Sequence, residues 1–553
     1  MSAKPISIMP WHKPEPFKPL KMQDQAAYKD RLLEHNAALN VDSPVSPLNL
    51  SSIMCTISDM CCEQHIVGEM IANGMRVARF SMCGMKPSEQ GMLIKRFRSY
   101  VMEHSKIIER TCTISIAVEL KGAAVLIGKF ADNLEKIHIL SGDVLILTTN
   151  RGFDDRGTKE KIYVDYDELS AILRPKDKVL LEFGRIELIV RGVVDSDIVC
   201  DVIEGGDLTP LSEVTVIGVP LNIGPITEKD LEDVNFALDN QVDLIIVPMV
   251  RTVRTIEAFR EILGERCQTI ALFAKIESRQ AYDNFNDILR VSDGVVINRG
   301  RLSIELSSEK VMQVQKSMIA RANKAGKPAF VVTEYLNSMI HKCYPTFAEI
   351  TDVINAIVEG ADGIILEEET ASGDFPTITV RTLAQLCKEG EAQIWQTDIF
   401  NTLSYLASPP IDPAHAVCIS AVEAAFKLHA TGIFIVTVSG KSAKLMARYK
   451  PRCPIFAMTR YGAIARQLNL YKGILPVHII TPPHPCWAKD VDLRMQDGID
   501  IGKSMNIIKP GDALILVNCW RPGAGFTNNI RIVYASVDQP WVLPQPADQE
   551  EEI

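Results

Sequence analysis

The stretch Thr269-Ile270-Ala271-Leu272-Phe273-Ala274-Lys275-Ile276-Glu277 begins as a short apolar run and ends with a lysine and a glutamate two positions apart. An apolar run of this length predicts a buried strand. Side chains two positions apart on a strand point to the same side, so Lys275 and Glu277 can reach one ligand beyond the strand's C-terminal end. A second run, 294–297, is followed in the same way by Asn298-Arg299-Gly300-Arg301.

Runs of this kind recur eight times, and helical periodicity fills most of the gaps between them. Eight strands that alternate with helices predict a (β/α)8 barrel, and a long doubly wound sheet is the alternative that the strand count disfavours. The predicted strands are 53–57, 76–82, 114–120, 244–249, 269–275, 294–297, 329–333 and 363–366, and the predicted helices include 63–73, 228–240, 253–263, 309–325 and 345–359.

The barrel pattern is interrupted once and is followed by a second α/β unit. Residues 123–213 alternate apolar and polar side chains between turn-forming glycines, which predicts an inserted β domain after the third barrel strand. Such an insert lies over the C-terminal face of the barrel, where barrel active sites form. The predicted parts are an N-terminal arm and helix (1–45, helix 25–39), a barrel in two pieces (46–122 and 214–392), the insert (123–213), a C-terminal α/β domain (393–540) and an acidic tail (541–553).

The composition is that of a globular protein, with 47% hydrophobic and 23% charged residues among 553. A formal net charge of −10 without a basic cluster argues against nucleic acid and anionic membranes as partners. We find no apolar run long enough for a transmembrane helix and no signal peptide. The 13 cysteines are scattered, which favours reduced thiols and a cytoplasmic location.

The segment 274–278 is similar to the Ser-Lys-Ile-Glu-Asn signature of the pyruvate kinase family, and further family segments follow in order. The resemblance implies the barrel, insert and C-terminal domain predicted above. It also implies phosphoryl transfer from phosphoenolpyruvate to ADP, the last step of glycolysis, with Mg²⁺ and K⁺ as cofactors and a tetrameric assembly. The other matching segments are 74–79, 292–294, 299–300, 325–328, 338–340, 352–356, 360–362, 369–371, 447–454 and 520–528.

The resemblance also implies roles for individual residues. Arg79 matches a phosphate-binding arginine, Lys275 a lysine that balances charge on the transferring group, and Glu277 one Mg²⁺ ligand. Thr333 matches a threonine near the proton-transfer step. The implied substrate-binding positions are Arg299, Gly300 and Lys121.

Other positions depart from the family pattern. Arg301 stands where the family has the second Mg²⁺ carboxylate, and Leu126 where it has an arginine that faces the substrate phosphate. A cation in place of a metal-binding carboxylate exchanges an attraction to Mg²⁺ for a repulsion. At about 4 Å and an effective dielectric constant of about 20, each of these two interaction energies is about 4 kcal/mol. The further altered positions are Ser81, Cys83, Glu119 and Leu120 at the K⁺ site, Gly84 near the nucleotide, and Pro248, Glu334, Glu367 and Glu368 around the mouth.

These losses lead to competing hypotheses. In one, Arg301 pairs with Glu277, and the protein is inactive or very slow, with a structural or regulatory role in a homo-oligomer or beside an active paralogue. In the other, Glu277 with Glu334 or Glu367 holds Mg²⁺ in a working enzyme. For Arg301 itself, the alternative to the pair is that it turns to solvent and leaves Glu277 to bind the metal alone and weakly. A different phosphorylated ligand in the altered mouth is a third option.

The segment Thr437-Val438-Ser439-Gly440-Lys441-Ser442 lies between a predicted strand and a predicted helix. Hydroxyl side chains and a glycine at a helix N-terminus favour an anion. The segment resembles the family's fructose-1,6-bisphosphate loop, and a plain strand–helix turn is the alternative. The resemblance adds Trp487, Arg494, Gly523 and Gly525 to this effector pocket.

Overall fold

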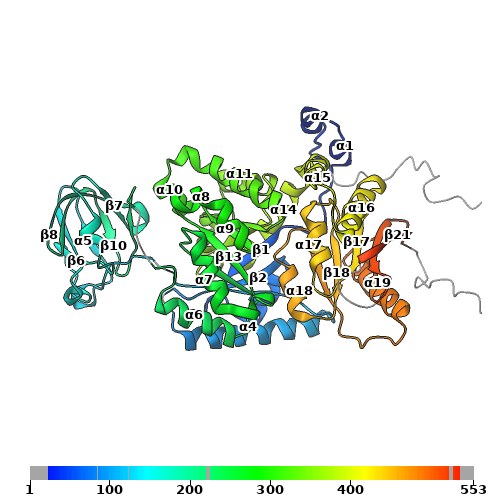
Figure 1. The fold of residues 1–553 in the computed structure, drawn as a ribbon, viewed down its shortest axis with the longest axis horizontal. Coiled ribbons are helices and arrows are strands. Elements are labelled where there is room, and N and C mark those ends of the chain that lie inside the picture. The colour runs from blue at the N-terminus through cyan, green and yellow to red at the C-terminus, as the bar shows by residue number, and fades with distance from the viewer. Residues whose placement is uncertain (1–22, 84, 123, 220–223, 522–526, 536–553) are drawn as a thin grey trace, which may run out of the picture.

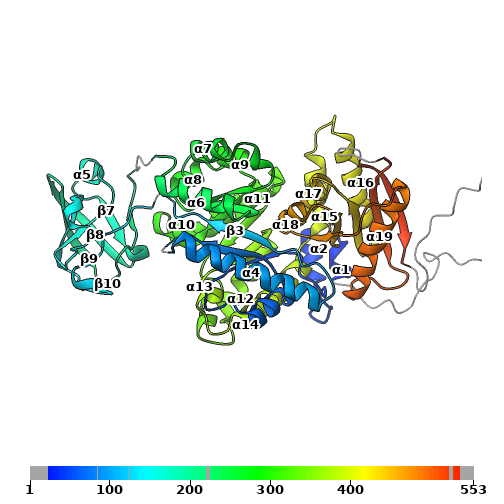
Figure 2. The same ribbon diagram turned by 90° about the horizontal axis from the view of Figure 1, so that it is seen from below.

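The computed structural model describes residues 23–83, 85–122, 124–219, 224–521 and 527–535. Figure 1 shows three bodies in a row, with the barrel between a small β domain at one end and an α/β domain at the other. Figure 2 shows the same order from below. The predicted acidic tail and most of the predicted N-terminal arm lie outside the described residues.

The central body is a closed barrel of parallel strands in the order β1-β16-β15-β14-β13-β12-β3-β2. The eight predicted strands are therefore confirmed, and the doubly wound sheet is excluded. The strands are β1 (Ser52–Thr56), β2 (Met75–Ser81), β3 (Ser115–Glu119), β12 (Leu244–Val247), β13 (Ala271–Ile276), β14 (Gly294–Asn298), β15 (Ala329–Val332) and β16 (Gly363–Leu366).

Helices surround the barrel and cover the outer side of its strands (Figure 1). The longest, α4 (Pro87–Ile107), was not among the predicted helices. Its buried apolar side chains, Leu93, Ile94 and Phe97, all lie in its N-terminal half, so its apolar stripe is short. The others are α3 (Gln64–Ala72), α6 (Glu228–Asp239), α7 (Val253–Leu263), α8 (Arg279–Asp283), α9 (Phe285–Val291), α10 (Arg299–Glu305), α11 (Ser308–Ala325), α12 (Phe347–Val358), α13 (Glu368–Ala371) and α14 (Pro376–Gln393).

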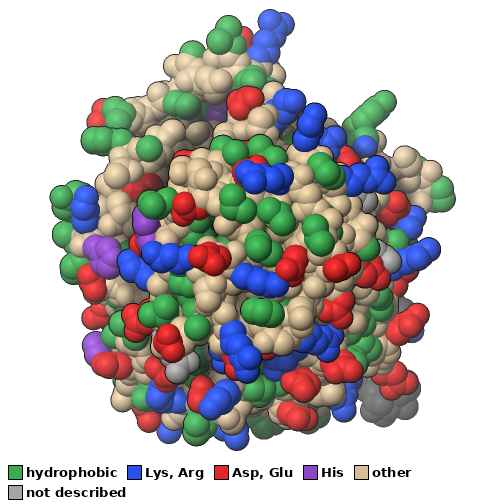
Figure 3. Space-filling view, turned by 90° about the vertical axis from the view of Figure 1, so that its left-hand side faces the viewer, with side chains coloured by type: hydrophobic (Ala, Val, Ile, Leu, Met, Phe, Trp, Pro, Cys, Tyr) green, Lys and Arg blue, Asp and Glu red, His purple; other side chains and the backbone are tan. Residues whose placement is uncertain are grey.

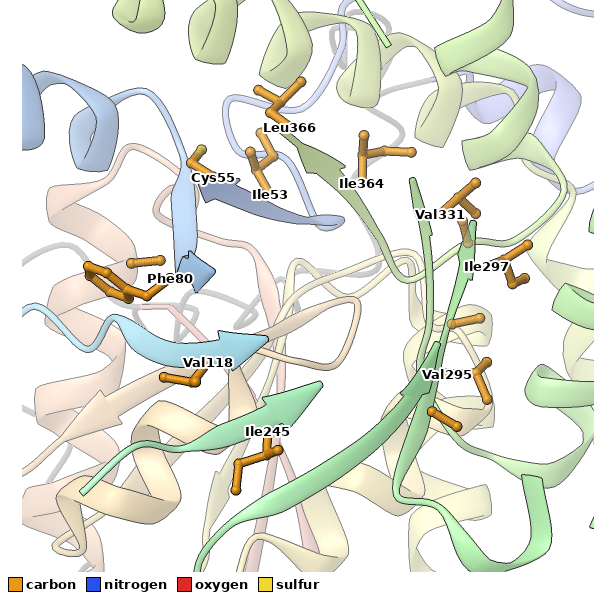
Figure 4. Packing of buried hydrophobic residues seen from close by; sticks show 14 of the residues in the cluster. Ile53, Cys55, Phe80, Val118, Ile245, Val295, Ile297, Val331, Ile364 and Leu366 are labelled. Atoms are coloured by element: carbon orange, nitrogen blue, oxygen red, sulfur yellow. The ribbon is translucent and has the colours of Figure 1, made fainter. Parts of the chain in front are cut away.

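The alternation of side chains along each strand separates two apolar layers. One set fills the barrel interior and includes Met54, Phe273 and Phe330. The other points outward to the helices, as Figure 4 shows for Ile53, Phe80 and other labelled residues. Both layers are almost fully buried, so the barrel fixes the direction of every side chain at its C-terminal mouth.

The inserted domain contains a six-stranded sheet in the order β11-β7-β8-β9-β5-β6 and a two-stranded sheet of β10 and β4. Figure 3 looks onto this end of the molecule and shows acidic and basic side chains interspersed. The elements are β4 (Ile137–Ile139), β5 (Val144–Thr148), β6 (Lys161–Tyr163), α5 (Leu169–Ile172), β7 (Lys178–Leu181), β8 (Ile186–Val194), β9 (Asp197–Glu204), β10 (Gly206–Leu208) and β11 (Val214–Val216).

The C-terminal domain has a five-stranded sheet in the order β19-β18-β17-β20-β21, in which only β21 is antiparallel. Strand β19 was not predicted. The elements are α15 (Gln396–Tyr405), α16 (Pro413–Leu428), β17 (Gly432–Val436), α17 (Lys441–Arg448), β18 (Ile455–Thr459), α18 (Gly462–Leu468), β19 (Ile474–His478), α19 (Trp487–Ser504), β20 (Ala513–Cys519) and β21 (Thr527–Tyr534).

The predicted helix 25–39 is wrong in detail, because it is broken into α1 (Asp24–Ala27) and α2 (Leu32–Ala37). Buried His35 accounts for the packing of the pair. Its ring nitrogens lie 2.8 Å from the Ala26 carbonyl and 3.0 Å from the Gln393 carbonyl, so it joins both short helices to the end of α14.

The C-terminal domain packs on the end of the barrel opposite the mouth. Lys450 of that domain pairs with Asp362, just before β16, and Arg466 pairs with Asp243, just before β12. The mouth is thus left to face the inserted domain. Among the helices of the described residues, none has the length and apolarity to cross a membrane.

Candidate active site

Polar side chains from five barrel strands converge at the mouth. On β13, Phe273 points into the barrel, and the two-residue period places Lys275 and Glu277 on the same side above it. Because the strands are parallel, residues at the ends of neighbouring strands reach the same level. Five of these side chains are at least nine-tenths buried, namely Arg79, Glu119, Lys275, Glu277 and Asn298.

Glu119 binds both cations of the mouth. Its Oε2 lies 2.6 Å from Arg79 Nε, and its Oε1 lies 2.7 Å from Lys275 Nζ. Burial would raise the pKa of Glu119, but Arg79 and Lys275 outweigh it and lower the pKa to about 2. Burial would lower the pKa values of Lys275 and Arg79, and the surrounding carboxylates, Glu119 first, reverse that shift. All three side chains therefore stay charged at neutral pH.

Glu277 is held from three directions. The Met249 N–H donates to its Oε2 at 2.7 Å, and Asn298 Nδ2 donates to its Oε1 at 2.7 Å. Lys275 Nζ lies 3.5 Å from the same Oε1. Each carboxylate oxygen thus already accepts a hydrogen bond from the protein.

Glu367, the residue after β16, adds a third carboxylate. Its Oε1 lies 2.9 Å from Arg79 Nη2 and 4.0 Å from Lys275 Nζ. Its side chain is 38% exposed, against 9% for Glu119 and 4% for Glu277. Two cations and three carboxylates give this group a net charge of −1.

Arg301 makes a different contact from the one that the sequence predicts. Its backbone N–H donates to Asn298 Oδ1 at 3.2 Å in the first turn of α10, and its guanidinium forms an ion pair with Glu213. Glu213 belongs to the returning segment of the insert, just before β11, and lies opposite Leu126 in a β-bridge. Burial raises the pKa of Glu213, and Arg301 partly offsets that shift. Nothing in the local sequence pointed to Glu213.

The remaining predicted residues are spread around the mouth. Arg299 forms a two-point ion pair with Asp352 of α12. Leu126 is anchored in the insert, where its N–H donates to Asp165 at 2.6 Å. Thr333 follows β15, and its carbonyl accepts the Tyr335 N–H at 2.6 Å, while Lys121 donates its N–H to Asp233. Gly300 is exposed, and Pro248 packs against Gly122. Gly84 lies outside the described residues.

Comparison with known proteins decides the family. A family model described as the barrel domain of pyruvate kinase matches residues 48–380, and one described as its alpha/beta domain matches residues 415–533. The chain belongs to the pyruvate kinase family. It is 34% identical to pyruvate kinase PKLR of Rattus norvegicus and of Homo sapiens over 517 residues, which is 93% of this chain and 90% of each relative. It is 31% identical to pyruvate kinase 1 of Trypanosoma brucei brucei over 503 residues, 91% of this chain and 99% of the relative.

Pyruvate kinases generally depend on Mg²⁺ and K⁺, so the donors in the mouth must be tested against both ions. Among the described residues, no group of three or more His, Cys, Asp or Glu side chains is placed to hold a metal. The Glu277 oxygens are engaged, and a guanidinium occupies position 301. At the K⁺ positions, Cys83 offers sulfur, which suits a hard cation poorly, and Leu120 offers no side-chain donor. The donor set fits neither ion.

The loop 437–442, which the resemblance suggested as an effector site, has a compact hydroxyl-rich geometry. The Gly440 N–H donates to Thr437 Oγ1 at 3.0 Å, and Ser442 Oγ lies 2.8 Å from Thr527 Oγ1. Ser439 is exposed, and the Lys441 side chain is 70% exposed. Elsewhere in the predicted pocket, the Arg494 guanidinium lies over the Trp487 ring and pairs with Asp490, while Gly523 and Gly525 lie outside the described residues.

Proposed function

We propose that this chain is a pyruvate kinase homologue in which phosphoryl transfer from phosphoenolpyruvate to ADP is absent or very slow. We further propose that it serves as a structural or regulatory protein, as a homo-oligomer or beside an active paralogue, in the cytoplasm. The observation that carries the proposal is the engagement of both Arg79 and Lys275 by Glu119. The two side chains that would bind the phosphoryl group, Arg79 and Lys275, are therefore already paired with a carboxylate of the protein.

Phosphoryl transfer depends on cations that stabilise negative charge on the transferring group. Here the five charged groups of the mouth sum to −1 before an anionic substrate arrives, and Arg301 is paired with Glu213. One surplus unit charge at about 4 Å is worth up to about 4 kcal/mol at an effective dielectric constant of about 20. If only a third of that opposes the transition state, the rate falls about tenfold for each such charge.

The test is pyruvate formation from phosphoenolpyruvate and ADP by the purified protein. The assay contains Mg²⁺ or Mn²⁺ and is run with and without K⁺ and fructose-1,6-bisphosphate. We expect no turnover above background for the natural chain and a measurable gain for the double variant Leu126→Arg/Arg301→Asp. Turnover by the natural chain within about tenfold of a typical ~10 s⁻¹ would overturn the proposal.

A working Mg²⁺-dependent enzyme remains the second candidate, because one contact favours it. Lys275 Nζ lies 3.5 Å from Glu277 Oε1 and 4.0 Å from Glu367 Oε1, so two carboxylates already approach one cation. For Mg²⁺ to bind between these two carboxylates, Lys275 and the present hydrogen-bond partners of Glu277 would have to move away. In that case the natural chain turns over, and Leu126→Arg/Arg301→Asp brings no gain.

The effector loop supports a regulatory part of the proposal. The N-terminus of α17, with the exposed Lys441 and the nearby Ser442 hydroxyl, is of the kind that favours a phosphate. We propose that it binds a sugar bisphosphate of the fructose-1,6-bisphosphate type. A rise in melting temperature with fructose-1,6-bisphosphate that Ser442→Ala abolishes would support this assignment, and an unchanged melting temperature would reject it.

A further inference from the structure

The carboxylates of the mouth differ in how freely they can move. Glu119 and Glu277 are buried and each receives two or more contacts from the protein, whereas the Glu367 side chain is 38% exposed. The main chain of Glu367 is fixed, because its N–H donates to the buried carboxylate of Glu369 at 2.7 Å. The side chain of Glu367 can therefore leave its position while its backbone stays in place.

The Glu367 carboxylate occupies a position that suits an external anion. Its Oε1 lies 2.9 Å from Arg79 Nη2 and faces Lys275 Nζ at 4.0 Å, while the other face of the Arg79 guanidinium is taken by Glu119. Arginine is a preferred partner of phosphate and carboxylate groups, because its planar fork presents several N–H donors. Glu119 already holds Nε of Arg79, and Thr56 Oγ1 accepts from its Nη1 at 2.7 Å, so an external phosphate at Nη2 would compete with Glu367.

We infer that Glu367 is an internal, displaceable ligand that occupies an anion site between Arg79 and Lys275 and thereby sets the affinity of the mouth for phosphate groups. The inference rests on the proposed function and adds a specific cause for weak substrate binding. The chemical class that would take the site is a phosphate monoester or inorganic phosphate. Replacing the carboxylate by an amide changes the net charge of the group from −1 to zero and leaves Arg79 Nη2 without an anionic partner.

The experiment measures binding of inorganic phosphate by titration calorimetry in the presence of EDTA, so that neither metal nor turnover contributes. We expect Glu367→Gln to bind phosphate at least about tenfold more tightly than the natural chain, which corresponds to a fraction of one unit charge at this distance. The matched control is Glu368→Gln. Glu368 is the next residue and is exposed, so this variant should bind phosphate as weakly as the natural chain does.

The location of the bound phosphate is tested separately. A crystal structure of Glu367→Gln grown with phosphate should show a phosphate oxygen within hydrogen-bonding distance of Arg79 Nη2. Equal affinity in Glu367→Gln and the natural chain, or phosphate bound elsewhere, would overturn the inference. The proposed function fails by a different result, namely turnover by the natural chain, so the two failures are distinguishable.

Discussion

At the scale of single residues, neutralising a buried glutamate that forms ion pairs with two cations lowers the stability of the fold. Replacing Glu119 by glutamine leaves Arg79 and Lys275 buried without their main counter-charge. Breaking a buried ion pair in this way typically costs about 3–5 kcal/mol. We expect Glu119→Gln to lower the free energy of unfolding of the barrel by about that amount at pH 7, measured by urea denaturation. The exposed Glu334→Gln in the same mouth is the control and should leave it unchanged.

The same residue predicts a pH dependence. The pKa of Glu119 is about 2 in the folded protein, below its ordinary value of 4.5, so the stability it contributes is present above about pH 4.5 and is lost as the pH falls toward about 2. The difference in stability between the natural chain and Glu119→Gln should therefore shrink across that interval, because protonated Glu119 resembles glutamine. A difference that stays constant down to pH 2 would contradict the pKa assignment.

At the scale of elements, the close packing of β16 against β15 and β1 requires a glycine at the start of β16. A Cβ added at Gly363, the first residue of β16, would lie 2.4 Å from Phe330 Cε1 and 2.6 Å from the Ser52 carbonyl oxygen. Because Phe330 belongs to the packed interior, neither contact can relax cheaply. We expect Gly363→Ala to destabilise the barrel by about 1–3 kcal/mol, measured by thermal unfolding. Gly192→Ala in β8, whose Cβ would meet nothing within 4 Å, should change the melting temperature little.

At the scale of the whole molecule, ion pairs join the barrel to the C-terminal domain. Arg466 Nε lies 2.8 Å from Asp243 Oδ1, and Asp243 is 1% exposed and also accepts the Ile116 N–H. Arg466→Met leaves this carboxylate buried without its cation. Because the Arg466 side chain is 35% exposed, we expect a cost of about 2 kcal/mol, below that of a fully buried pair.

Differential scanning calorimetry measures this coupling, because the two domains should unfold together in the natural chain and separately in Arg466→Met. The control is Arg290→Met, which removes an exposed partner of Asp287 within a single helix. Separate transitions in the natural chain, or a single unchanged transition in Arg466→Met, would show that the pair does not couple the domains.

The sequence alone determined the barrel and the residues at its mouth, because both follow from local patterns. Short apolar runs predict strands, and the two-residue period puts Lys275 and Glu277 on one side of β13 whatever surrounds them. The ordered motifs likewise identified the family. Helix α4 and strand β19 escaped prediction, and helix 25–39 was predicted too long, because propensity is weak evidence where the apolar stripe is short or packing interrupts it.

Only the tertiary structure decided which charges meet. Arg301 and Glu213 are 88 residues apart, and Glu367 reaches Arg79 of β2 only because β16 closes the barrel beside β1, which in turn pairs with β2. Local sequence patterns carry no information on which residues from distant parts of the chain come into contact. Since the net charge around Arg79 and Lys275 depends on those long-range partners, the sequence named the residues of the mouth, and the closed barrel with its returning insert decided their electrostatic state.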